Sequence, residues 1–173
     1  MQSVDLQSLI RSIPDFPKPG ILFRDITPLL KDKAGFRASI DRMAAPFVEQ
    51  KIDYVVAIEA RGYMLGAPIA YKLGAGLIPV RKPGKLPYEK ISEDYALEYG
   101  TNSLEVHNDA VAAGQRVLIV DDLLATGGTA RATVRLLAKL GAVIVGCVFL
   151  VELAALEGRK LLGDTPVTTF ITY

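Results

Sequence analysis

The sequence has almost none of the residues that build disulfides or zinc sites. Its 173 residues include one cysteine, Cys147, and one histidine, His107. A single cysteine excludes an intrachain disulfide, and one cysteine with one histidine cannot supply the ligands of a zinc site. Because Cys147 lies within the apolar run Ala142–Leu153, we expect a buried, unreactive thiol. We expect His107 in an exposed loop, without a catalytic role.

Long apolar runs and an excess of charge of one sign are also missing. No run reaches the roughly 18 apolar residues of a membrane-spanning helix, and the N-terminus lacks the basic-then-apolar pattern of a signal peptide. The 20 basic side chains nearly balance the 19 acidic ones, for a net charge of +1. This balance argues against nucleic acid and membrane partners, although a local basic cluster remains open. We therefore expect a soluble, cytoplasmic protein.

What the sequence does contain is an alternation of buried strands and helices. Short apolar runs rich in β-branched residues are typical of strands that are covered on both faces of a parallel sheet. These runs are Tyr54–Ile58, Gly76–Val80, Arg116–Val120 and Val143–Val151. Between these runs are segments whose apolar residues recur at helical spacing, Gly62–Leu73 and Gly128–Leu140. The pattern predicts an α/β fold with an open, mostly parallel sheet flanked by helices, whose ligands lie beyond the carboxyl ends of the strands.

The flanking segments follow other patterns. Apolar residues from Leu6 to Ile13 recur at helical spacing, and a second helical stripe runs from Phe36 to Val48, where Pro46 ends or distorts it. The stretch Pro83–Gly100 is long, polar and without sustained periodicity, which is typical of a functional lid or of disorder.

The most informative segment is Val117–Ala130, which reads VLIVDDLLATGGTA. The strand delivers Asp121 and Asp122 to the carboxyl edge of the sheet. Two glycines then allow a tight turn in which amide N–H groups converge on an anion, and two threonines add hydroxyl donors before the positive end of a helix. Carboxylates so close to a phosphate are suited to sugar hydroxyls or to a bound Mg²⁺.

Two further strand ends carry cations. Arg61 follows the first strand in Glu59–Gly62, where a small residue and a glycine allow backbone and guanidinium to face one anion. Arg81, Lys82 and Lys85 follow the next strand. Taken alone, each group also fits a solvated surface, but beside the first motif they suit a pyrophosphate, whose several negative charges need neutralising.

Other phosphate motifs are absent, since the chain has no G-x-x-x-x-G-K-[ST] loop and no three-glycine dinucleotide fingerprint after a strand. Val117–Ala130 resembles the phosphoribosyl pyrophosphate (PRPP) signature of type I phosphoribosyltransferases. The resemblance implies that Asp121 and Asp122 hold the ribose hydroxyls and that Mg²⁺ is held mainly by PRPP, with these aspartates as further ligand candidates. It implies a 5-phosphate loop and a pyrophosphate group. The loop residues are Ala125, Thr126, Gly127, Gly128 and Thr129, and the pyrophosphate residues are Arg61, Arg81, Lys82 and Lys85. The family often has a non-proline cis peptide in the Glu59–Gly62 segment.

Five blocks taken in order are similar to the adenine phosphoribosyltransferase branch. They are Phe16–Pro28, Glu59–Gly62, Arg81–Pro87, Leu97–Gly100 and Asp121–Thr129. This resemblance implies an adenine-binding hood, in which Leu22 and Arg24 read the base through backbone groups and Phe23 packs on the purine. Leu153 would lie on the other face of the base. Of the catalytic residues so implied, Glu98 would handle the proton at N7, Tyr99 would close over the reaction, and Arg61 would contact the pyrophosphate.

The implied enzyme converts adenine and PRPP to AMP and pyrophosphate in purine salvage, as a Mg²⁺-dependent homodimer. We expect one domain over residues 1–173, with a hood at about 1–33 and a flexible loop at about 83–106. Glu59 departs from the Asp-Ser-Arg of several relatives, which leaves its role open. Two alternatives also remain: a phosphoribosyltransferase for another base, and a non-catalytic PRPP-sensing regulator on the same fold.

Overall fold

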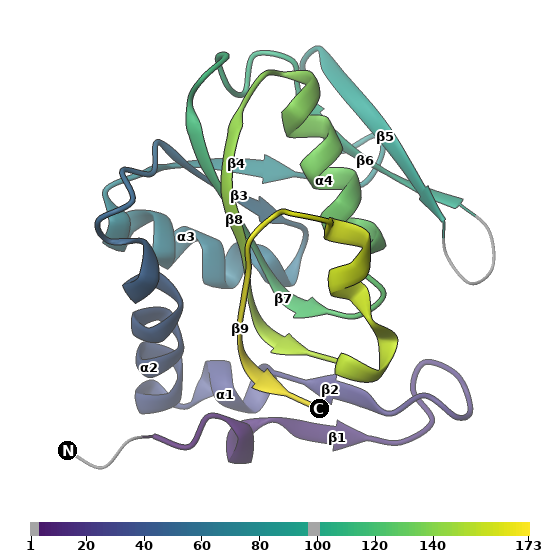
Figure 1. Ribbon diagram of the computed structural model, residues 1–173. Helices are drawn as coiled ribbons and strands as arrows, with labels where there is room; N and C mark the ends of the chain where they lie inside the picture. The colour runs from purple at the N-terminus through teal and green to yellow at the C-terminus, as the bar shows by residue number, and fades with distance from the viewer. Residues whose placement is uncertain (1–3, 97–100) are drawn as a thin grey trace. The chain divides into compact units, whose positions relative to one another are not determined.

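The computed structural model describes residues 4–96 and 101–173, which separate into two compact units, Met1–Arg42 and Met43–Tyr173 (Figure 1). The first unit contains a 3₁₀ turn η1 (Gln7–Leu9) and an antiparallel strand pair. Two helices follow, α1 and α2, and the last residues of α2 belong to the second unit. The bounds are β1 Arg11–Ile13, β2 Phe23–Asp25, α1 Thr27–Lys31 and α2 Lys33–Ala44.

The helix expected from Leu6 to Ile13 is wrong. The side chain of Asp5 accepts a hydrogen bond from the backbone N–H of Gln7 at 3.0 Å, which favours a short turn. Beyond this turn the chain is extended and pairs with β2, with Arg11 opposite Asp25. Hydrogen bonding with β2 therefore decides the conformation of this segment, against the helical spacing of its apolar residues. The second stripe is confirmed as α2, followed by a 3₁₀ turn η2 (Ala45–Phe47) that contains Pro46.

The second unit is built on a parallel sheet, as expected (Figure 1). Its five strands lie in the order β4-β3-β7-β8-β9. Their bounds are β3 Tyr54–Ile58, β4 Gly76–Val80, β7 Arg116–Leu124, β8 Val143–Glu152 and β9 Val167–Thr172. The threonine-rich strand β9 was not predicted, because it lies at the sheet edge and lacks a long apolar run.

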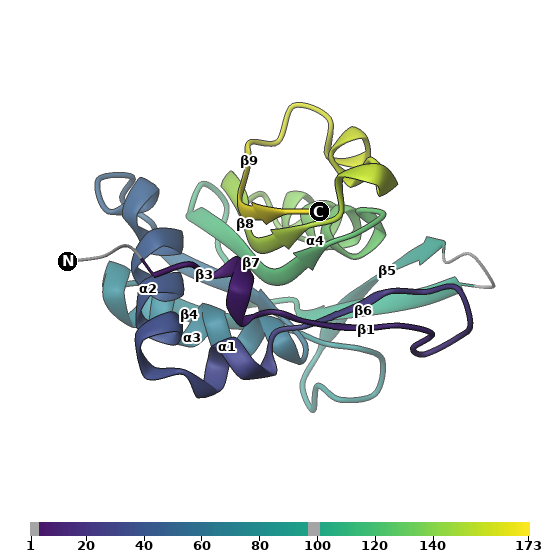
Figure 2. The same ribbon diagram turned by 90° about the horizontal axis from the view of Figure 1, so that it is seen from below.

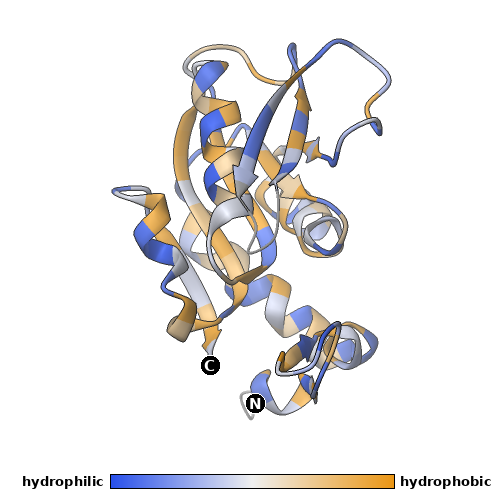
Figure 3. Cartoon of the chain, turned by 90° about the vertical axis from the view of Figure 1, so that its right-hand side faces the viewer, coloured by the Kyte–Doolittle hydropathy of each residue, from blue (hydrophilic) through white to orange (hydrophobic). Residues whose placement is uncertain are grey.

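The two long helices of this unit cover opposite faces of the sheet (Figure 2). A β-carbon on Gly66 of α3 (Arg61–Leu73) would lie 2.6 Å from that of Ala57, so this helix packs on the face that carries Ala57. Side chains of α4 (Gly128–Lys139) pack with Val56, whose side chain points to the other face. Figure 3 shows apolar residues along the central strands and polar residues recurring along α4.

An antiparallel hairpin of β5 (Lys90–Ala96) and β6 (Thr101–His107) occupies much of the stretch expected as a lid. Glu93 ties the hairpin to α4 through Arg135 at 3.1 Å and Lys139 at 2.7 Å. His107 ends β6 and is half-buried against Tyr88, so its expected place in an exposed loop is wrong.

None of the helices in the described residues is long and apolar enough to cross a membrane.

Candidate active site

An open pocket of about 350 Å³ lies at the carboxyl ends of β3 and β7. This is the sheet edge at which a parallel α/β fold is expected to bind its ligands. The pocket brings together seven of the residues predicted from the sequence or left open there, from segments up to 70 positions apart. They are Glu59, Arg61, Lys82, Asp121, Asp122, Ala125 and Thr129.

The two aspartates sit at the end of β7, which extends four residues beyond the expected strand. The Asp121 carboxylate accepts a hydrogen bond from the backbone N–H of Asp122 at 2.8 Å, and the Asp122 carboxylate lies 2.8 Å from Nε of Arg61. Asp122 is buried; Asp121 keeps some exposed surface but is densely surrounded by protein atoms. Burial raises the pKa of Asp121 well above its usual range, and the adjacent charge of Asp122 raises it further. Burial also raises the pKa of Asp122, against the opposing effect of Arg61.

A glycine loop joins β7 to α4 and lines a second, smaller pocket of about 60 Å³. Gly127 is the N-cap of α4 and has φ +85°, a conformation that favours glycine. Thr126 is exposed, and Thr129 lies in the first turn of the helix, half-buried. The first N–H groups of a helix have no partner within the helix, so together with threonine hydroxyls they are suited to a phosphate-sized anion.

Three of the predicted cations are paired with carboxylates. Glu59 has a side chain only 4% exposed, and its oxygens lie 3.0 Å from Arg81 and 3.0 Å from Lys85. Burial alone would raise the pKa of Glu59, but hydrogen bonds from Lys85 and Arg81 outweigh it and hold the pKa below its usual range. Arg61 is the third, paired with Asp122. Lys82 is exposed and lines the large pocket.

The hairpin brings further side chains to the pocket. Tyr95 of β5 and Asn102 of β6 face each other in register and both line it. The predicted catalytic residues Glu98 and Tyr99 lie outside the described residues. The Glu59–Ala60 peptide bond is cis, as the family resemblance led us to expect.

The residues predicted to bind adenine fall in both units. Leu153 follows β8, is half-buried, and its N–H donates to the carbonyl of Leu124 at 2.9 Å. In the first unit, Leu22 is exposed and Phe23 and Arg24 belong to β2. The ring of Phe23 contacts that of Phe16 edge-to-face, with centroids 5.1 Å apart.

Sequence reasoning missed two features of the site. It left the role of Glu59 open, although a carboxylate at a strand end beside several cations was a usable signal. It also overlooked Gly158, which is buried against the glycine loop. No local pattern could have revealed that contact, because the two segments are about 30 residues apart and meet only in the folded protein.

Comparison with known proteins shows the family to which the chain belongs. The model of the phosphoribosyl transferase domain family matches residues 29–171. Adenine phosphoribosyltransferase from Acaryochloris marina is 59% identical over 170 residues, which cover 98% of this chain and all of that protein. The protein of the same name from Thermotoga maritima is 57% identical over 173 residues and the full length of both chains.

Comparison with solved structures leads to the same group of proteins. The adenine phosphoribosyltransferase of Thermoanaerobacter pseudethanolicus superposes with a TM-score of 0.95 at 54% identity, over 97% of this chain and 98% of that one. The enzyme of Saccharomyces cerevisiae, solved with adenine and an iminoalditol bisphosphate, gives 0.90 at 41% identity over 95% of each chain. The chain therefore belongs to the phosphoribosyltransferase family, and within it to the adenine phosphoribosyltransferases.

Proposed function

We propose that the protein transfers the 5-phosphoribosyl group of PRPP to adenine and releases AMP and pyrophosphate, a step of purine salvage. The observation that carries the proposal is the pocket at the ends of β3 and β7, in which an acidic pair, cations and the edge of a glycine–threonine loop meet. Each group matches one part of PRPP: the ribose hydroxyls, the pyrophosphate and the 5-phosphate.

The reaction is a displacement at the anomeric carbon. The bond from this carbon to the pyrophosphate oxygen breaks, a bond to N9 of adenine forms, and positive charge develops on the ribose ring. Asp121 and Asp122 hold the ribose hydroxyls, and Ala125–Thr129 hold the 5-phosphate through N–H and hydroxyl donors. Arg61 and Lys82 line the pocket where the pyrophosphate leaves, and Arg81 and Lys85 reinforce the positive charge beside it.

Mg²⁺ belongs to this proposal as a metal carried mainly by PRPP. The residues described contain no group of three or more His, Cys, Asp or Glu side chains that could hold a metal by themselves. Asp121 and Asp122 offer hard carboxylate oxygens at the pocket wall, which suit Mg²⁺ as additional ligands. When bound, the metal neutralises charge on the leaving pyrophosphate.

Adenine is selected by backbone groups in the proposed hood. The N–H and carbonyl groups at Leu22 and Arg24 read the exocyclic amine and N1, Phe23 packs on one face of the base, and Leu153 packs on the other. A 6-oxopurine presents the opposite donor and acceptor pattern at positions 1 and 6, so it would leave buried polar groups unpaired. Glu98 accepts the proton at N7, and Tyr99 covers the reacting atoms.

The remaining parts of the proposal concern assembly and location. We propose a homodimer, on the basis of resemblance to the family, and a single functional domain with a hood at about 1–33 and a flexible loop at about 83–106. We also propose a cytoplasmic location, where the charged substrates of purine salvage are found.

The proposal is tested by supplying PRPP and Mg²⁺ with adenine, hypoxanthine, guanine or uracil in turn. Among the four bases, we expect only adenine to cause release of pyrophosphate from PRPP. Turnover only of another base would refute the assignment of adenine, and tight PRPP binding without turnover of any base would instead favour a regulator.

A variant then tests the proton acceptor. Glu98→Ala is expected to lower turnover by 10²-fold or more while leaving the affinity for PRPP nearly unchanged, because the carboxylate acts on the base. Unchanged turnover would remove Glu98 from the mechanism.

A further inference from the structure

The glycine loop between β7 and α4 rests on a segment from the far end of the chain. A β-carbon on Gly127 would lie 2.3 Å from the carbonyl oxygen of Gly158, and one on Gly158 would lie 2.2 Å from that of Ala125. Backbone therefore meets backbone with no room for a side chain on either segment. Gly158 begins the 3₁₀ turn η4 (Gly158–Leu162), whose last residue, Leu162, is buried in the core.

The residue after Gly158 is held by an unusually complete set of partners. Arg159 donates to both oxygens of Glu152 at 2.7 Å, to the hydroxyl of Thr169 at 2.9 Å and to the carbonyl of Val167 at 2.9 Å. The Thr169 hydroxyl donates in turn to Glu152 at 2.9 Å. A planar guanidinium is suited to such a fork of acceptors, whereas an ammonium group makes point contacts and cannot reproduce it.

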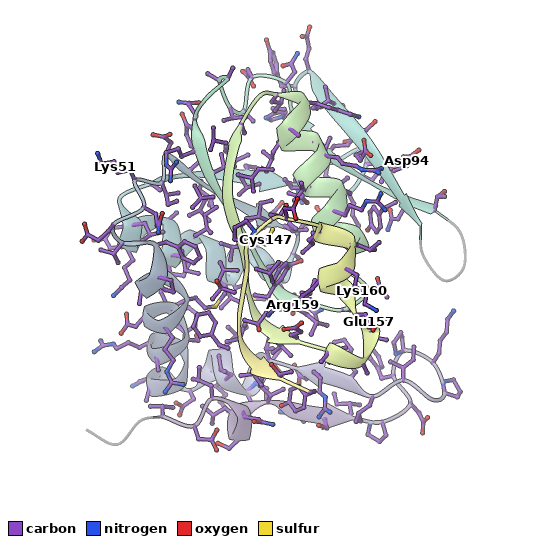
Figure 4. The ribbon with its side chains drawn as sticks, viewed as in Figure 1. Lys51, Asp94, Cys147, Glu157, Arg159 and Lys160 are labelled. Atoms are coloured by element: carbon purple, nitrogen blue, oxygen red, sulfur yellow. The ribbon has the colours of Figure 1, made fainter. Side chains whose placement is uncertain are left out.

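This network links two strands to the turn that backs the loop. Glu152 ends β8, directly before Leu153, and Thr169 lies in β9. Figure 4 shows Arg159 between these strands and the turn, whereas Lys160 and Glu157 lie at the outer edge of the same segment. Hydrogen bonding to Arg159 lowers the pKa of Glu152, so the pair stays charged at neutral pH.

We propose that Arg159 is a positioning residue for the 5-phosphate loop, acting through Gly158. By fixing the turn to β8 and β9, it holds the carbonyl of Gly158 against Gly127 and keeps the N–H groups of the loop converged on the phosphate. The inference rests on the proposed assignment of Ala125–Thr129 to the 5-phosphate. It predicts that damage to the network weakens recognition of phosphate specifically, and not of the base.

The test compares ligands with and without phosphate. Arg159→Met is expected to raise KM for PRPP and Kd for AMP about tenfold, because small displacements of a binding group are costly, and to change KM for adenine less than about twofold. Arg159→Lys should fall between this variant and the unmodified protein. Gly158→Ala, which pushes directly on the loop, should give the same pattern.

The matched control is Lys160→Met, since Lys160 is adjacent, exposed and paired only with Glu157 among the described ion pairs; it should leave all three constants unchanged. Equal weakening of adenine and PRPP would show a general structural role and would overturn the proposal, as would an unchanged KM for PRPP in Arg159→Met. If Arg159→Met does not fold, as judged by circular dichroism, Arg159→Lys and Gly158→Ala decide by the same criteria.

Failure of the underlying site assignment is distinguished by Thr126→Val, which removes a hydroxyl from the loop itself. If this variant leaves Kd for AMP unchanged, the assignment of the phosphate loop is wrong. If it weakens AMP while Arg159→Met, Arg159→Lys and Gly158→Ala do not, the loop assignment stands and the role of Arg159 is refuted.

Discussion

The acidic pair at the end of β7 should weaken the fold while serving the ligand. Two carboxylates stand on adjacent residues, and the described ion pair of Arg61, at 2.8 Å, is with Asp122. Two like charges a few ångströms apart repel by roughly 4 kcal/mol at an effective dielectric near 20. We therefore expect Asp121→Asn to stabilise the protein and at the same time to weaken PRPP binding.

The expected gain in the free energy of unfolding of Asp121→Asn is smaller than the repulsion energy between the two carboxylates. Asp121 keeps contact with solvent through the pocket, and its charge is also attracted by Arg61, so both effects reduce the net penalty. An asparagine retains the oxygen that accepts the N–H of Asp122 at 2.8 Å, so that contact is preserved. We expect the free energy of unfolding to rise by about 0.5–1.5 kcal/mol at pH 7, within the range usual for relieving strain at a functional site.

Urea denaturation across a pH series checks both the sign and the cause. The folded pKa of Asp121 is raised, so the destabilisation by its charge is fully present above that pKa. The penalty disappears as the pH falls below the ordinary aspartate value of about 3.9, where the two proteins should converge. Asp122→Asn is the comparison variant. It relieves the same repulsion but also removes the charge that lies 2.8 Å from Arg61, so its gain should be smaller than that of Asp121→Asn. No gain for Asp121→Asn at pH 7, or a gain that persists in acid, would refute the reasoning.

Three further predictions concern other parts of the second unit. Glu59→Gln should lower the free energy of unfolding by about 1 kcal/mol at pH 7, since both basic partners are partly solvated. Because the pKa of Glu59 is lowered, this loss should vanish as the pH falls through that pKa in urea titrations, and a loss independent of pH would contradict the ion-pair explanation. Cys147 is 0% exposed and burial raises its pKa to about 12, so a thiol reagent at pH 8 should label it only after unfolding; rapid labelling of the native protein would contradict its burial. Gly66→Ala should destabilise by about 1–3 kcal/mol in thermal unfolding, because the added carbon lies 2.6 Å from that of Ala57, whereas a neutral effect would mean that α3 can shift away from the sheet.

The parts predicted well from the sequence are those that depend on local pattern. Continuous β-branched runs gave the bounds of β3 and β4, and helical spacing gave α3 and α4 to within a residue at each end. The segment Val117–Ala130 indicated the loop, because strand, acid pair, glycines and threonines are contiguous there. Burial on both faces of a sheet and tight turns impose such patterns directly on neighbouring residues.

The parts that were missed depend on contacts between distant segments. Residues 6–13 have helical spacing but form a turn and a strand, because pairing with β2 decides their conformation. The hairpin of β5 and β6 and the edge strand β9 are polar enough to resemble loops, and their partners supply the hydrogen bonds that make them strands.

The same distinction between local pattern and long-range contact applies to the site. The sequence by itself determined the class of fold, the glycine–threonine loop after β7 and the residue types at each strand end, since chemistry and turn geometry constrain those positions locally. Only the tertiary structure decided that Glu59 holds Arg81 and Lys85, that Arg61 pairs with Asp122, and that Gly158 backs the loop. Ion pairs and backbone contacts of this kind are fixed by how strands and turns far apart in the chain are brought to one edge of the sheet, and nothing in the residues next to them specifies the partner.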